Sequence, residues 1–455
     1  MKKNEKIVLE ITSMSHDGDG VGRYSGLVVF VPMTAVGDVI EAKIVKMLKN
    51  RAYAIIARII TPSPHRAQND CPVFSRCGGC SLRHIEYHHE LSVKSGWVVE
   101  NIKRIGGVKD FTLEPPLFSP LVSRYRNKAQ YPVRRVDGKI RAGFFRGRSH
   151  GLVPVDDCLL QPEFFGDITA EVIRFAEEYS IEPYDEATGA GILRHIFIRH
   201  AEASNETMVC LVVNKGGLPH KEELAAALHS RCRTVKTVLV NENADNTNVI
   251  FGKNTRVVSG SGYITDKLAG VRVRLSVRSF YQVNRAAAEI LYEASLLYAS
   301  PQKTDVLLDL YCGAGTIGLS MAHAVKEVIG VELVADAVRD AEATARLNGI
   351  QNARFIHADA ALEADALTQK GVRPDIVIVD PPRKGLQENL PASIAQLAPH
   401  KLVYISCNPA TLARDIERLC SLGFKLIKAR AVDLFPRTAH VEAIALLQLD
   451  LPCVK

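Results

Sequence analysis

The sequence contains no long hydrophobic run and no apolar signal segment. No stretch of its 455 residues approaches the ~18 uncharged apolar residues that a membrane span requires. The basic start, residues 1–10, leads directly into charged residues rather than into a signal core. These absences exclude a membrane protein, and we expect a cytoplasmic one. With 47% hydrophobic residues the chain can still build real cores, which excludes a disordered protein.

Cysteine is present, but not at the density of a disulfide-bonded protein. Ten cysteines are spread over a chain long enough for roughly three domains. Three of them cluster as Cys71-x5-Cys77-x2-Cys80, with Cys158 downstream, and the glycines at 78–79 leave room for a bulky group. The paired C-x2-C knuckles of structural zinc are missing, so the pattern favours an iron–sulfur cubane, with zinc as the alternative. The C-x3-C-x2-C triad of radical chemistry is also absent.

Positive charge is in slight surplus overall but is concentrated in one segment. The chain has 57 Lys and Arg against 50 Asp and Glu, a net charge of +7, whereas residues 124–148 alone carry a net +8. Cations interleaved with aromatic residues indicate a surface for looped, single-stranded RNA, and a solvated basic face is the alternative. We single out Arg126, Lys128, Arg134 and Arg135 as RNA contacts. The other basic residues are Arg124, Lys139, Arg141, Arg146 and Arg148, and the aromatic residues are Tyr125, Tyr131, Phe144 and Phe145.

Short runs of alternating polarity dominate the first 60 residues. Such alternation predicts strands, and four or five strands in this length predict a small barrel of the oligonucleotide-binding kind. A structural cap without a ligand is the alternative. Pro62 and Pro64 then break the pattern, so we place a domain boundary at residue 61. The predicted strands are 6–11, 27–31, 39–45 and 53–60, and the predicted turns are 17–20, 22–23 and 36–38.

Residues 85–105 have the spacing of an amphipathic helix. Trp97, the single tryptophan, lies among its apolar positions, and we expect it to anchor packing. From 117 to about 275 the chain mixes strand patterns with the basic segment, which predicts an α+β unit. The apolar side of the predicted helix consists of Leu91, Val98, Ile102 and Ile105.

From about 280 to 449, apolar strands alternate with alanine-rich helices, which predicts a doubly wound parallel sheet. The first strand leads into a turn containing Gly313, and the second ends in Glu332, where a carboxylate can accept both ribose hydroxyls. No third glycine serves a pyrophosphate, so we expect a nucleoside without phosphates, such as S-adenosylmethionine. Asp359 closes the next strand, where it either meets the adenine amino group or is an ordinary turn residue.

Three reactive side chains follow at the ends of further strands. Asp380 ends an apolar strand, and Cys407 ends another, ahead of a helix that Asn408 should cap and Pro409 should begin. The dipole of that helix should favour the Cys407 thiolate. Glu442 is a lone carboxylate in an apolar closing strand, a costly position unless it has a function.

A thiolate, a carboxylate and a methyl donor in one crevice suit the methylation of carbon 5 of a pyrimidine. The thiolate adds to carbon 6 and makes carbon 5 nucleophilic, and after methyl transfer a base removes the carbon 5 proton.

Five stretches of the second half resemble, in order, the motifs of the RNA uracil-5-methyltransferases, and within them the iron–sulfur 23S rRNA group of the RlmD, RlmC and RlmCD type. The amino-terminal barrel looks like the TRAM domain of these enzymes. The matching stretches are Ser279-Phe280-Tyr281-Gln282-Val283-Asn284, Asp309-Leu310-Tyr311-Cys312-Gly313, Asp380-Pro381-Pro382-Arg383-Lys384-Gly385, Ser406-Cys407-Asn408-Pro409 and His440-Val441-Glu442.

The resemblance implies a fold, a reaction and residue roles. The fold would be α/β, with an OB-like TRAM barrel, a central α+β iron–sulfur RNA-binding domain and a Rossmann-like methyltransferase domain. Cys407 would be the nucleophile and Glu442 the base in the methylation of a 23S rRNA uridine, with Phe280 against the uracil. Thr316 stands where some relatives have asparagine, which leaves its contact open. The cofactor-binding residues would be Gln282, Tyr311, Gly313, Thr316, Glu332, Asp359 and Asp380.

The resemblance also implies a 4Fe-4S cluster on Cys71, Cys77, Cys80 and Cys158, and a monomer that takes a flipped, looped uridine. The predicted helix would pack on the catalytic domain and make that domain discontinuous. The domains would then be 1–61 for the TRAM barrel, 62–90 with 118–275 for the central domain, and 91–117 with 276–455 for the methyltransferase.

Two other functions fit fewer of the residues. A cytosine-5 or amino-directed methyltransferase is one, but Asp-Pro-Pro-Arg lacks the aromatic fourth residue of amino methylation, and Glu442 favours a uracil. An RNA-binding or redox-sensing protein with an inactive methyltransferase domain is the other. The presence of every polar residue of the proposed site argues against it.

Overall fold

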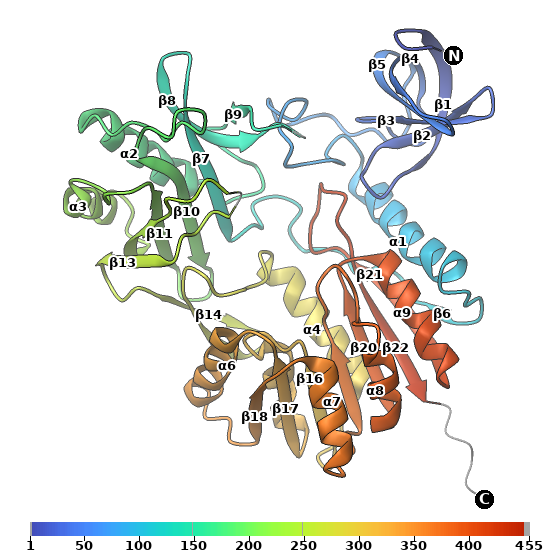
Figure 1. The fold of residues 1–455 in the computed structure, drawn as a ribbon. Coiled ribbons are helices and arrows are strands. Elements are labelled where there is room, and N and C mark those ends of the chain that lie inside the picture. The colour runs from blue at the N-terminus through green and yellow to red at the C-terminus, as the bar shows by residue number, and fades with distance from the viewer. Residues whose placement is uncertain (1, 148, 248, 450–455) are drawn as a thin grey trace, which may run out of the picture.

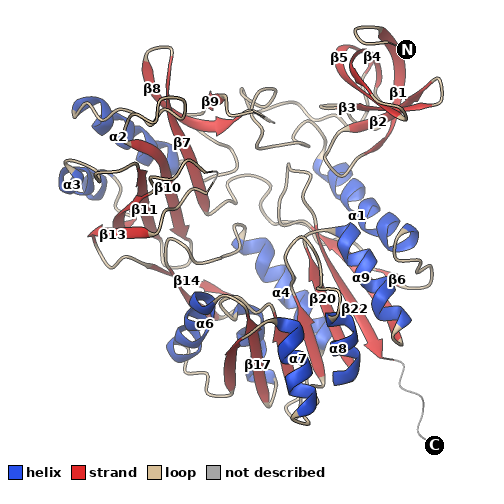
Figure 2. Cartoon of the chain, in the orientation of Figure 1, coloured by secondary structure: helices blue, strands red, loops and turns tan. Residues whose placement is uncertain are grey.

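The computed structural model describes residues 2–147, 149–247 and 249–449, so Arg148 of the basic segment lies outside it. These residues form a closed barrel, two larger sheets and a separate hairpin. Figure 1 shows the barrel at the upper right and, at the upper left, the sheet within residues 128–259, here called the central sheet. The sheet formed mainly by residues 306–449, here called the third sheet, lies below them. Helices gather around the third sheet, whereas the barrel consists of strands alone (Figure 2). None of the described helices is long and apolar enough to cross a membrane.

The amino-terminal unit is a closed barrel with the strand order β1-β2-β3-β5-β4, which confirms the predicted fold. Its interior is filled by alternate residues of each strand, for example Ile7, Leu9 and Ile11 of β1. Alternation therefore predicts which side chains face inward. The strands are β1 (Lys6–Met14), β2 (Gly20–Tyr24), β3 (Leu27–Val31), β4 (Val39–Met47) and β5 (Arg51–Thr61).

The predicted turn at residues 22–23 is wrong, because both residues belong to β2. A Cβ at Gly22 would lie 2.5 Å from the backbone oxygen of Glu10 and 2.6 Å from the Leu9 side chain. This glycine therefore serves the close approach of β1 and β2 in a small barrel, not a reversal of the chain.

Helix α1 (Tyr87–Arg104) buries Leu91, Trp97, Val98 and Ile102, in line with the predicted apolar side. Ile105 is the exception: it follows the helix and is 44% exposed. Trp97, Val98 and Ile102 share a core with helix α9 (Pro409–Ser421), which packs on the third sheet.

The predicted domain boundary between residues 90 and 91 falls inside α1, which begins at Tyr87. We propose a boundary before Tyr87, which keeps the helix whole. The rest of the predicted domain division stays a prediction.

The central unit is a seven-stranded sheet with the order β13-β12-β11-β10-β7-β8-β9. One face carries Ile196 and Ile198 against helices α2 and α3, and the opposite face carries Phe197 and Met208 toward the third sheet. The elements are β7 (Lys128–Val136), β8 (Lys139–Phe145), β9 (Leu152–Pro154), α2 (Phe164–Glu178), β10 (Leu193–Ala201), β11 (Glu206–Val213), α3 (Lys221–Arg231), β12 (Val235–Glu242) and β13 (Asn254–Ser259).

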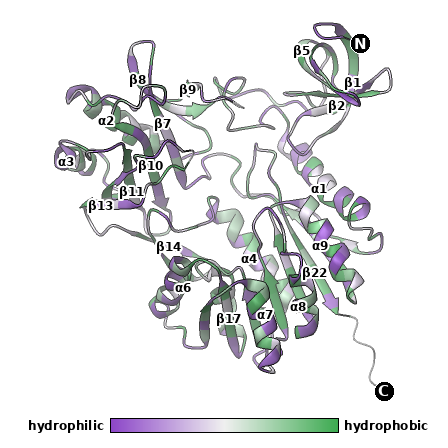
Figure 3. Cartoon of the chain, in the orientation of Figure 1, coloured by the Kyte–Doolittle hydropathy of each residue, from purple (hydrophilic) through white to green (hydrophobic). Residues whose placement is uncertain are grey.

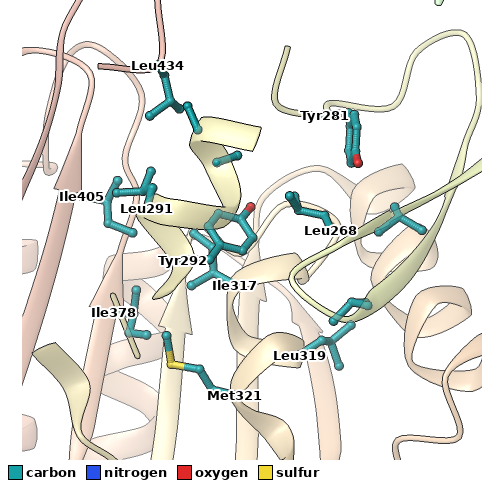
Figure 4. Packing of buried hydrophobic residues seen from close by; sticks show 14 of the residues in the cluster. Leu268, Tyr281, Leu291, Tyr292, Ile317, Leu319, Met321, Ile378, Ile405 and Leu434 are labelled. Carbon is teal, nitrogen blue, oxygen red and sulfur yellow. The ribbon is translucent and has the colours of Figure 1, made fainter. Parts of the chain in front are cut away.

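The hairpin of β14 (Ile264–Leu268) and β15 (Val271–Leu275) joins neither large sheet. Its apolar residues share one core with α4 (Arg285–Ala299) and the third sheet. Figure 4 shows Leu268 near Tyr292, and Leu291 beside Ile405 in this core. The hairpin thus fills the space between the central sheet and the third sheet.

The third sheet has eight strands in the order β18-β17-β16-β19-β20-β22-β21-β6. The first five are parallel, and β22 is antiparallel to both of its neighbours. This is the predicted doubly wound arrangement, with an added edge strand from residues 112–113. Its other elements are β6 (Thr112–Leu113), β16 (Val306–Leu310), α5 (Thr316–Met321), η1 (Ala322–Ala324), β17 (Glu327–Glu332), α6 (Ala335–Leu347), β18 (Ala353–His357), α7 (Ala360–Gln369), β19 (Ile376–Val379), α8 (Leu390–Leu397), β20 (Lys401–Ser406), β21 (Phe424–Val432) and β22 (Glu442–Leu449).

The middle strands of this sheet are covered on both faces. Every residue of β19 is buried, which is why the strand reads as an unbroken apolar run. Figure 3 shows the same contrast: strands such as β22 are largely hydrophobic, whereas helices such as α6 and α9 also carry hydrophilic residues.

A buried ionic network connects α1 to the loop between β21 and β22. The Lys94 ammonium, 1% exposed, donates to Glu90 Oε1 at 2.7 Å, Asp433 Oδ1 at 2.8 Å and the Phe435 carbonyl at 3.1 Å. The Arg437 backbone N–H donates to the same Glu90 oxygen at 2.7 Å. The loop is therefore held by charges that water does not screen.

We predict that Lys94→Ala lowers the free energy of unfolding by about 3–5 kcal/mol, because it leaves two buried carboxylates without their cation. The measurement is urea denaturation followed by the fluorescence of the single tryptophan, Trp97. Lys103→Ala, on the exposed side of the same helix, is the control and should change stability by less than about 0.5 kcal/mol. Equal effects of the two substitutions would contradict this prediction.

Candidate active site

The predicted reactive side chains meet at one edge of the third sheet. Asp380 and Cys407 directly follow the parallel strands β19 and β20, and the carboxyl ends of parallel strands lie at the same edge. Strand β22 is antiparallel to β20, with Ala443 opposite Ser406. Glu442 at its start is therefore brought beside Cys407.

The acids of this edge are held in an environment that disfavours ionisation. Burial raises the pKa of Asp380 to about 7. Burial and the Asp380 charge raise the pKa of Glu442 well above its ordinary value. Burial, Glu442 and Asp380 raise the pKa of the Cys407 thiol to about 11. A cation would relieve all three, because the same charges that oppose one another attract it.

The surroundings of Cys407 oppose the expected stabilisation of its thiolate at the amino end of a helix. Asn408 does cap α9, accepting from the Ala410 N–H at 3.1 Å, and Pro409 does begin it, as predicted. Burial and two neighbouring carboxyl groups, however, raise the pKa of the Cys407 thiol.

Arg383 and His440 belong to the same edge and were missed as site residues. The Arg383 guanidinium lowers the pKa of Cys407 and of Glu442, opposing the carboxylates. Its Nη2 lies 3.4 Å from His440 Nδ1. Burial and Arg383 lower the pKa of His440 to about 4, so this imidazole is neutral at pH 7. Both residues stand in recognised motifs, but the spacing of a motif does not show which side chains face one another.

The glycine turn after β16 lies against the end of β17. Glu332 Oε2 accepts from the Gly313 N–H at 3.1 Å, and its Oε1 accepts from the Val334 N–H at 2.8 Å. Tyr311 has a left-handed backbone, with φ of 64°, and its buried hydroxyl has no hydrogen-bond partner among the described residues. A strained residue with an unsatisfied hydroxyl suits a binding site.

Asp309 is a buried carboxylate that sequence reasoning left out. Its Oδ2 accepts from the Gly318 N–H at 3.0 Å, and its Oδ1 has no partner in the described part of the chain. Burial, together with Asp380 and Glu332, raises the pKa of Asp309 to about 7. An acid inside an apolar strand was the available signal, the same one that identified Glu442.

Four further residues that were predicted to contact the cofactor or the uracil lie in different surroundings. Asp359 caps α7, and its Oδ2 accepts from Gln387 Nε2 at 2.6 Å, so both of its oxygens are engaged. The Thr316 hydroxyl lies 2.8 Å from the Tyr292 hydroxyl. Gln282 is half-buried, while Phe280 is 72% exposed and free to meet a base. Asp359 and Thr316 thus have structural partners of their own.

Several arginines of the basic segment, residues 124–148, already form ion pairs within the protein. Arg134 pairs with Glu186, and Arg135 pairs with Glu182 at 2.7 Å, both across about 50 residues of sequence. Arg124 pairs with Asp157 at 2.5 Å. The net charge of +8 is therefore partly neutralised by acids from the two loops before and after α2.

Two of the predicted stacking aromatics are core residues. Tyr125 is 1% exposed and donates to the Pro436 carbonyl at 2.9 Å, and Tyr131 is 3% exposed. Neither offers a face to a nucleotide. Lys128 is half-buried, and burial, Arg199 and Arg126 lower the pKa of its amine to about 8.

The four clustered cysteines line a single cavity, with Arg126 in its wall. The segment 71–80 reaches β8, where the Gly78 N–H donates to the Phe145 carbonyl at 3.1 Å. Burial, opposed by Arg83, raises the pKa of Cys80 to about 12. Within the described ranges, no three His, Cys, Asp or Glu residues are close enough together to hold one metal ion.

Arg126 is not placed as an RNA contact. Its Nε is buried and has no hydrogen-bond partner among the described residues. Its charge opposes the rise that burial causes in the pKa values of Cys80 and Cys158 on one side, and it adds to the lowering of the His440 pKa on the other. Arg126 therefore stands between the cysteine cavity and the candidate active site.

Comparison with known proteins identifies the family. The model of the tRNA (uracil-5-)-methyltransferase family matches residues 201–449, and the model of the TRAM domain matches residues 2–57. The chain belongs to this family of uracil-5 RNA methyltransferases and carries a TRAM domain.

Relatives extend the similarity over the whole length. An RNA methyltransferase of Listeria monocytogenes is 41% identical over 453 residues, covering 99% of each chain. One of Halalkalibacterium halodurans is 39% identical over 449 residues, covering 99% of this chain and 98% of its own. The crystal structure of a Pyrococcus abyssi tRNA (uracil-54, C5)-methyltransferase with S-adenosyl-L-homocysteine has a TM-score of 0.77 and 26% identity, covering 97% of this chain and all of that one.

We predict that Asp380→Asn moves the pH profile of Cys407 alkylation to lower pH. With a pKa of about 11, only about one Cys407 thiol in 10,000 is ionised at pH 7, so the rate should rise with pH up to that value. Removing the Asp380 charge favours the thiolate and lowers the pKa. Iodoacetamide labelling, read at the Cys407 peptide by mass spectrometry, gives the profile. Glu332→Gln, whose charge does not reach Cys407, should leave it unchanged, and a wild-type midpoint near 8.5 would contradict the analysis.

Proposed function

We propose that this protein transfers the methyl group of S-adenosylmethionine to carbon 5 of a uridine in 23S rRNA. The observation that carries the proposal is the meeting of Cys407, Asp380 and Glu442 at one sheet edge. A thiol and a carboxylic acid are the two groups that addition at carbon 6 and proton removal at carbon 5 require.

Each residue has a role in this reaction. The Cys407 thiolate bonds to carbon 6 of the uracil, and the electron pair of the C5=C6 double bond moves to carbon 5. Carbon 5 then bonds to the methyl carbon while the methyl–sulfur bond of the donor breaks and its electron pair stays on the donor sulfur. The Glu442 carboxylate then takes the carbon 5 proton. The carbon–sulfur bond breaks, the double bond re-forms, and Cys407 leaves as a thiolate. Phe280, largely exposed, is proposed to lie against the uracil ring.

The electrostatics of the site support a cationic methyl donor. Burial raises the pKa of Asp380, and burial together with neighbouring carboxylates raises the pKa values of Asp309 and Cys407, so a cation would favour the ionised form of each group. The sulfonium and ammonium groups of S-adenosylmethionine are such cations. We propose that donor binding, together with Arg383, lowers the pKa of Cys407 enough for attack.

The donor is proposed to bind along the carboxyl ends of β16 and β17. Glu332 would accept the ribose hydroxyls, and Tyr311, Gly313 and Gln282 would complete the site. The solved relative from Pyrococcus abyssi, which holds S-adenosyl-L-homocysteine, supports this ligand class. Asp359 and Thr316 are also proposed to contact the donor, although each already has a hydrogen-bond partner, Gln387 and Tyr292 respectively.

The choice of 23S rRNA rests on the resemblance of the five motifs to the iron–sulfur 23S rRNA group. A transfer RNA is the second candidate, because the solved relative from Pyrococcus abyssi acts on uracil 54 of tRNA. Mapping of 5-methyluridine by mass spectrometry, in rRNA and tRNA from cells with and without the gene, separates the two. Loss of the modification from tRNA alone would overturn the rRNA assignment.

We predict that Cys407→Ala and Glu442→Gln stop the reaction at different steps. Without the thiol no covalent adduct and no methyl transfer should occur. Glu442→Gln keeps the size of the side chain but removes the base, so a methylated protein–RNA adduct should accumulate. A denaturing gel with labelled RNA measures the adduct.

Wild-type protein on RNA containing 5-fluorouridine is the matched control for this gel. It should trap in the same way as Glu442→Gln, because fluorine cannot leave as a proton does. An adduct or methylation by Cys407→Ala would show that another residue is the nucleophile.

A 4Fe-4S cluster on Cys71, Cys77, Cys80 and Cys158 is proposed as a structural group. Four thiols around one cavity are the ligand set that such a cluster takes. A zinc ion is the alternative occupant of the same four thiols, and the metal analysis below separates the two. The buried, unpartnered Nε of Arg126 in the same wall supports an anionic occupant. The cluster would fasten segment 71–80 to the loop that carries Cys158.

We predict about four irons per chain in anaerobically purified protein, with a brown colour. Cys71→Ala should lose iron and lower the folded yield, because ligation contributes to folding. Cys232→Ala, which removes a cysteine outside the cavity, is the matched control and should retain the metal. Iron and zinc are measured by mass spectrometry of the metals, and colourless, folded protein with one zinc per chain would contradict the cluster.

A further inference from the structure

Side chains at the start of helix α9 form hydrogen bonds with the backbone of the loop that follows Asp380. The Asn408 side chain donates from Nδ2 to the Arg383 carbonyl at 3.1 Å, and the Thr411 hydroxyl donates to the same oxygen at 3.4 Å. One turn further, Arg414 Nη2 donates to the Lys384 carbonyl at 2.9 Å. The helix that begins directly after Cys407 thus holds the backbone of residues 383–386, here named the clamp loop.

The buried carboxylate of Asp415, on the same helix, also binds the backbone of the clamp loop. Its Oδ2 accepts from the Leu386 N–H at 2.8 Å and from the Tyr404 hydroxyl at 2.7 Å. Its Oδ1 accepts from Arg414 Nε at 2.9 Å. A fully buried carboxylate is costly, and the part of the cost that the Leu386 N–H offsets is recovered only while the clamp loop keeps its place.

Gly385 shows how closely the clamp loop lies on this carboxylate. A Cβ at Gly385 would clash with Asp415 Oδ2 and with the Arg414 guanidinium, and the residue has a φ of +77°. Glycine is therefore required here both by the contact and by the backbone conformation.

The clamp loop is attached to both halves of the candidate active site. On the nucleophile side, Arg383 reaches His440, and its charge acts on Cys407 and Glu442. On the cofactor side, the next residues lead to Gln387, which donates to Asp359. A shift of the loop would move both contacts at once.

We propose that Asp415 is a positioning residue that fixes Asp380 and Arg383 relative to Cys407. The proposal rests on the function proposed above and concerns the same site. Asp415 is buried beneath the clamp loop, so it acts through Leu386 and Arg414 and does not itself touch substrate. Displacement of catalytic groups by about 1 Å costs about 100-fold in rate, which sets the size of effect expected.

The test compares Asp415→Ala, Asp415→Asn and a matched control in steady-state methylation. Asp415→Ala should lower kcat about 100-fold and, because Gln387 moves with the clamp loop, should also weaken the binding of S-adenosylmethionine. Asp415→Asn keeps an acceptor for the Leu386 N–H and should recover part of the loss. The control is Asp375→Ala, which removes a carboxylate that accepts the Val306 N–H at 2.8 Å at the opposite edge of the same sheet. It should leave kcat unchanged.

Cys407 reactivity gives a second readout that a merely structural role would not move. If the clamp loop loosens, Arg383 no longer lowers the pKa of Cys407, and the alkylation profile of Asp415→Ala moves to higher pH. If Asp415→Ala does not fold, Gly385→Ala is the second variant, because its Cβ would clash with Asp415 and displace the clamp loop. It should give the same loss of kcat and the same shift of the alkylation profile. Unchanged kcat and an unchanged profile, or an equal loss in Asp375→Ala, would overturn the proposal. Absence of methylation in the wild type would instead refute the proposed function.

Discussion

The buried ammonium of Lys94 is the contact on which the arrangement of the three units depends. It joins Glu90 of α1 to Asp433 and Phe435 of the loop before β22. That loop also receives Tyr125 of the central unit at Pro436, and its Arg437 carbonyl accepts from the Ser81 and Leu82 N–H groups beside the cysteine cavity. Trp97 of α1 donates to Met14 of the barrel at 2.9 Å. The barrel, the cysteine segment and the loop that leads into β22 are therefore connected, directly or through one another, to helix α1.

This arrangement explains how residues far apart in the chain act on one crevice. The loop held by Lys94 ends at His440 and Glu442, and the clamp loop held by Asp415 carries Arg383. Two buried carboxylate systems thus hold the segments on the two sides of Cys407. Because each is shielded from water, its hydrogen bonds are strong and costly to break, which keeps these side chains in fixed positions.

The charges of the crevice act on the ionisation of Cys407. Asp380 opposes the ionisation of Glu442, and both carboxyl groups oppose that of Cys407, while Arg383 acts in the opposite direction. In the proposed reaction, the cationic methyl donor would add to the effect of Arg383 and favour the thiolate.

The sequence by itself determined the barrel, the doubly wound sheet and the placing of Asp380, Cys407 and Glu442 at one edge. Alternating polarity and residues at strand ends are local signals, and topology converts them into position. Only the tertiary structure decided that Arg134 and Arg135 are paired, that Tyr125 and Tyr131 are buried, and that the thiol pKa rises. Ion pairing and desolvation depend on distances between residues remote in sequence, and no local pattern records those distances.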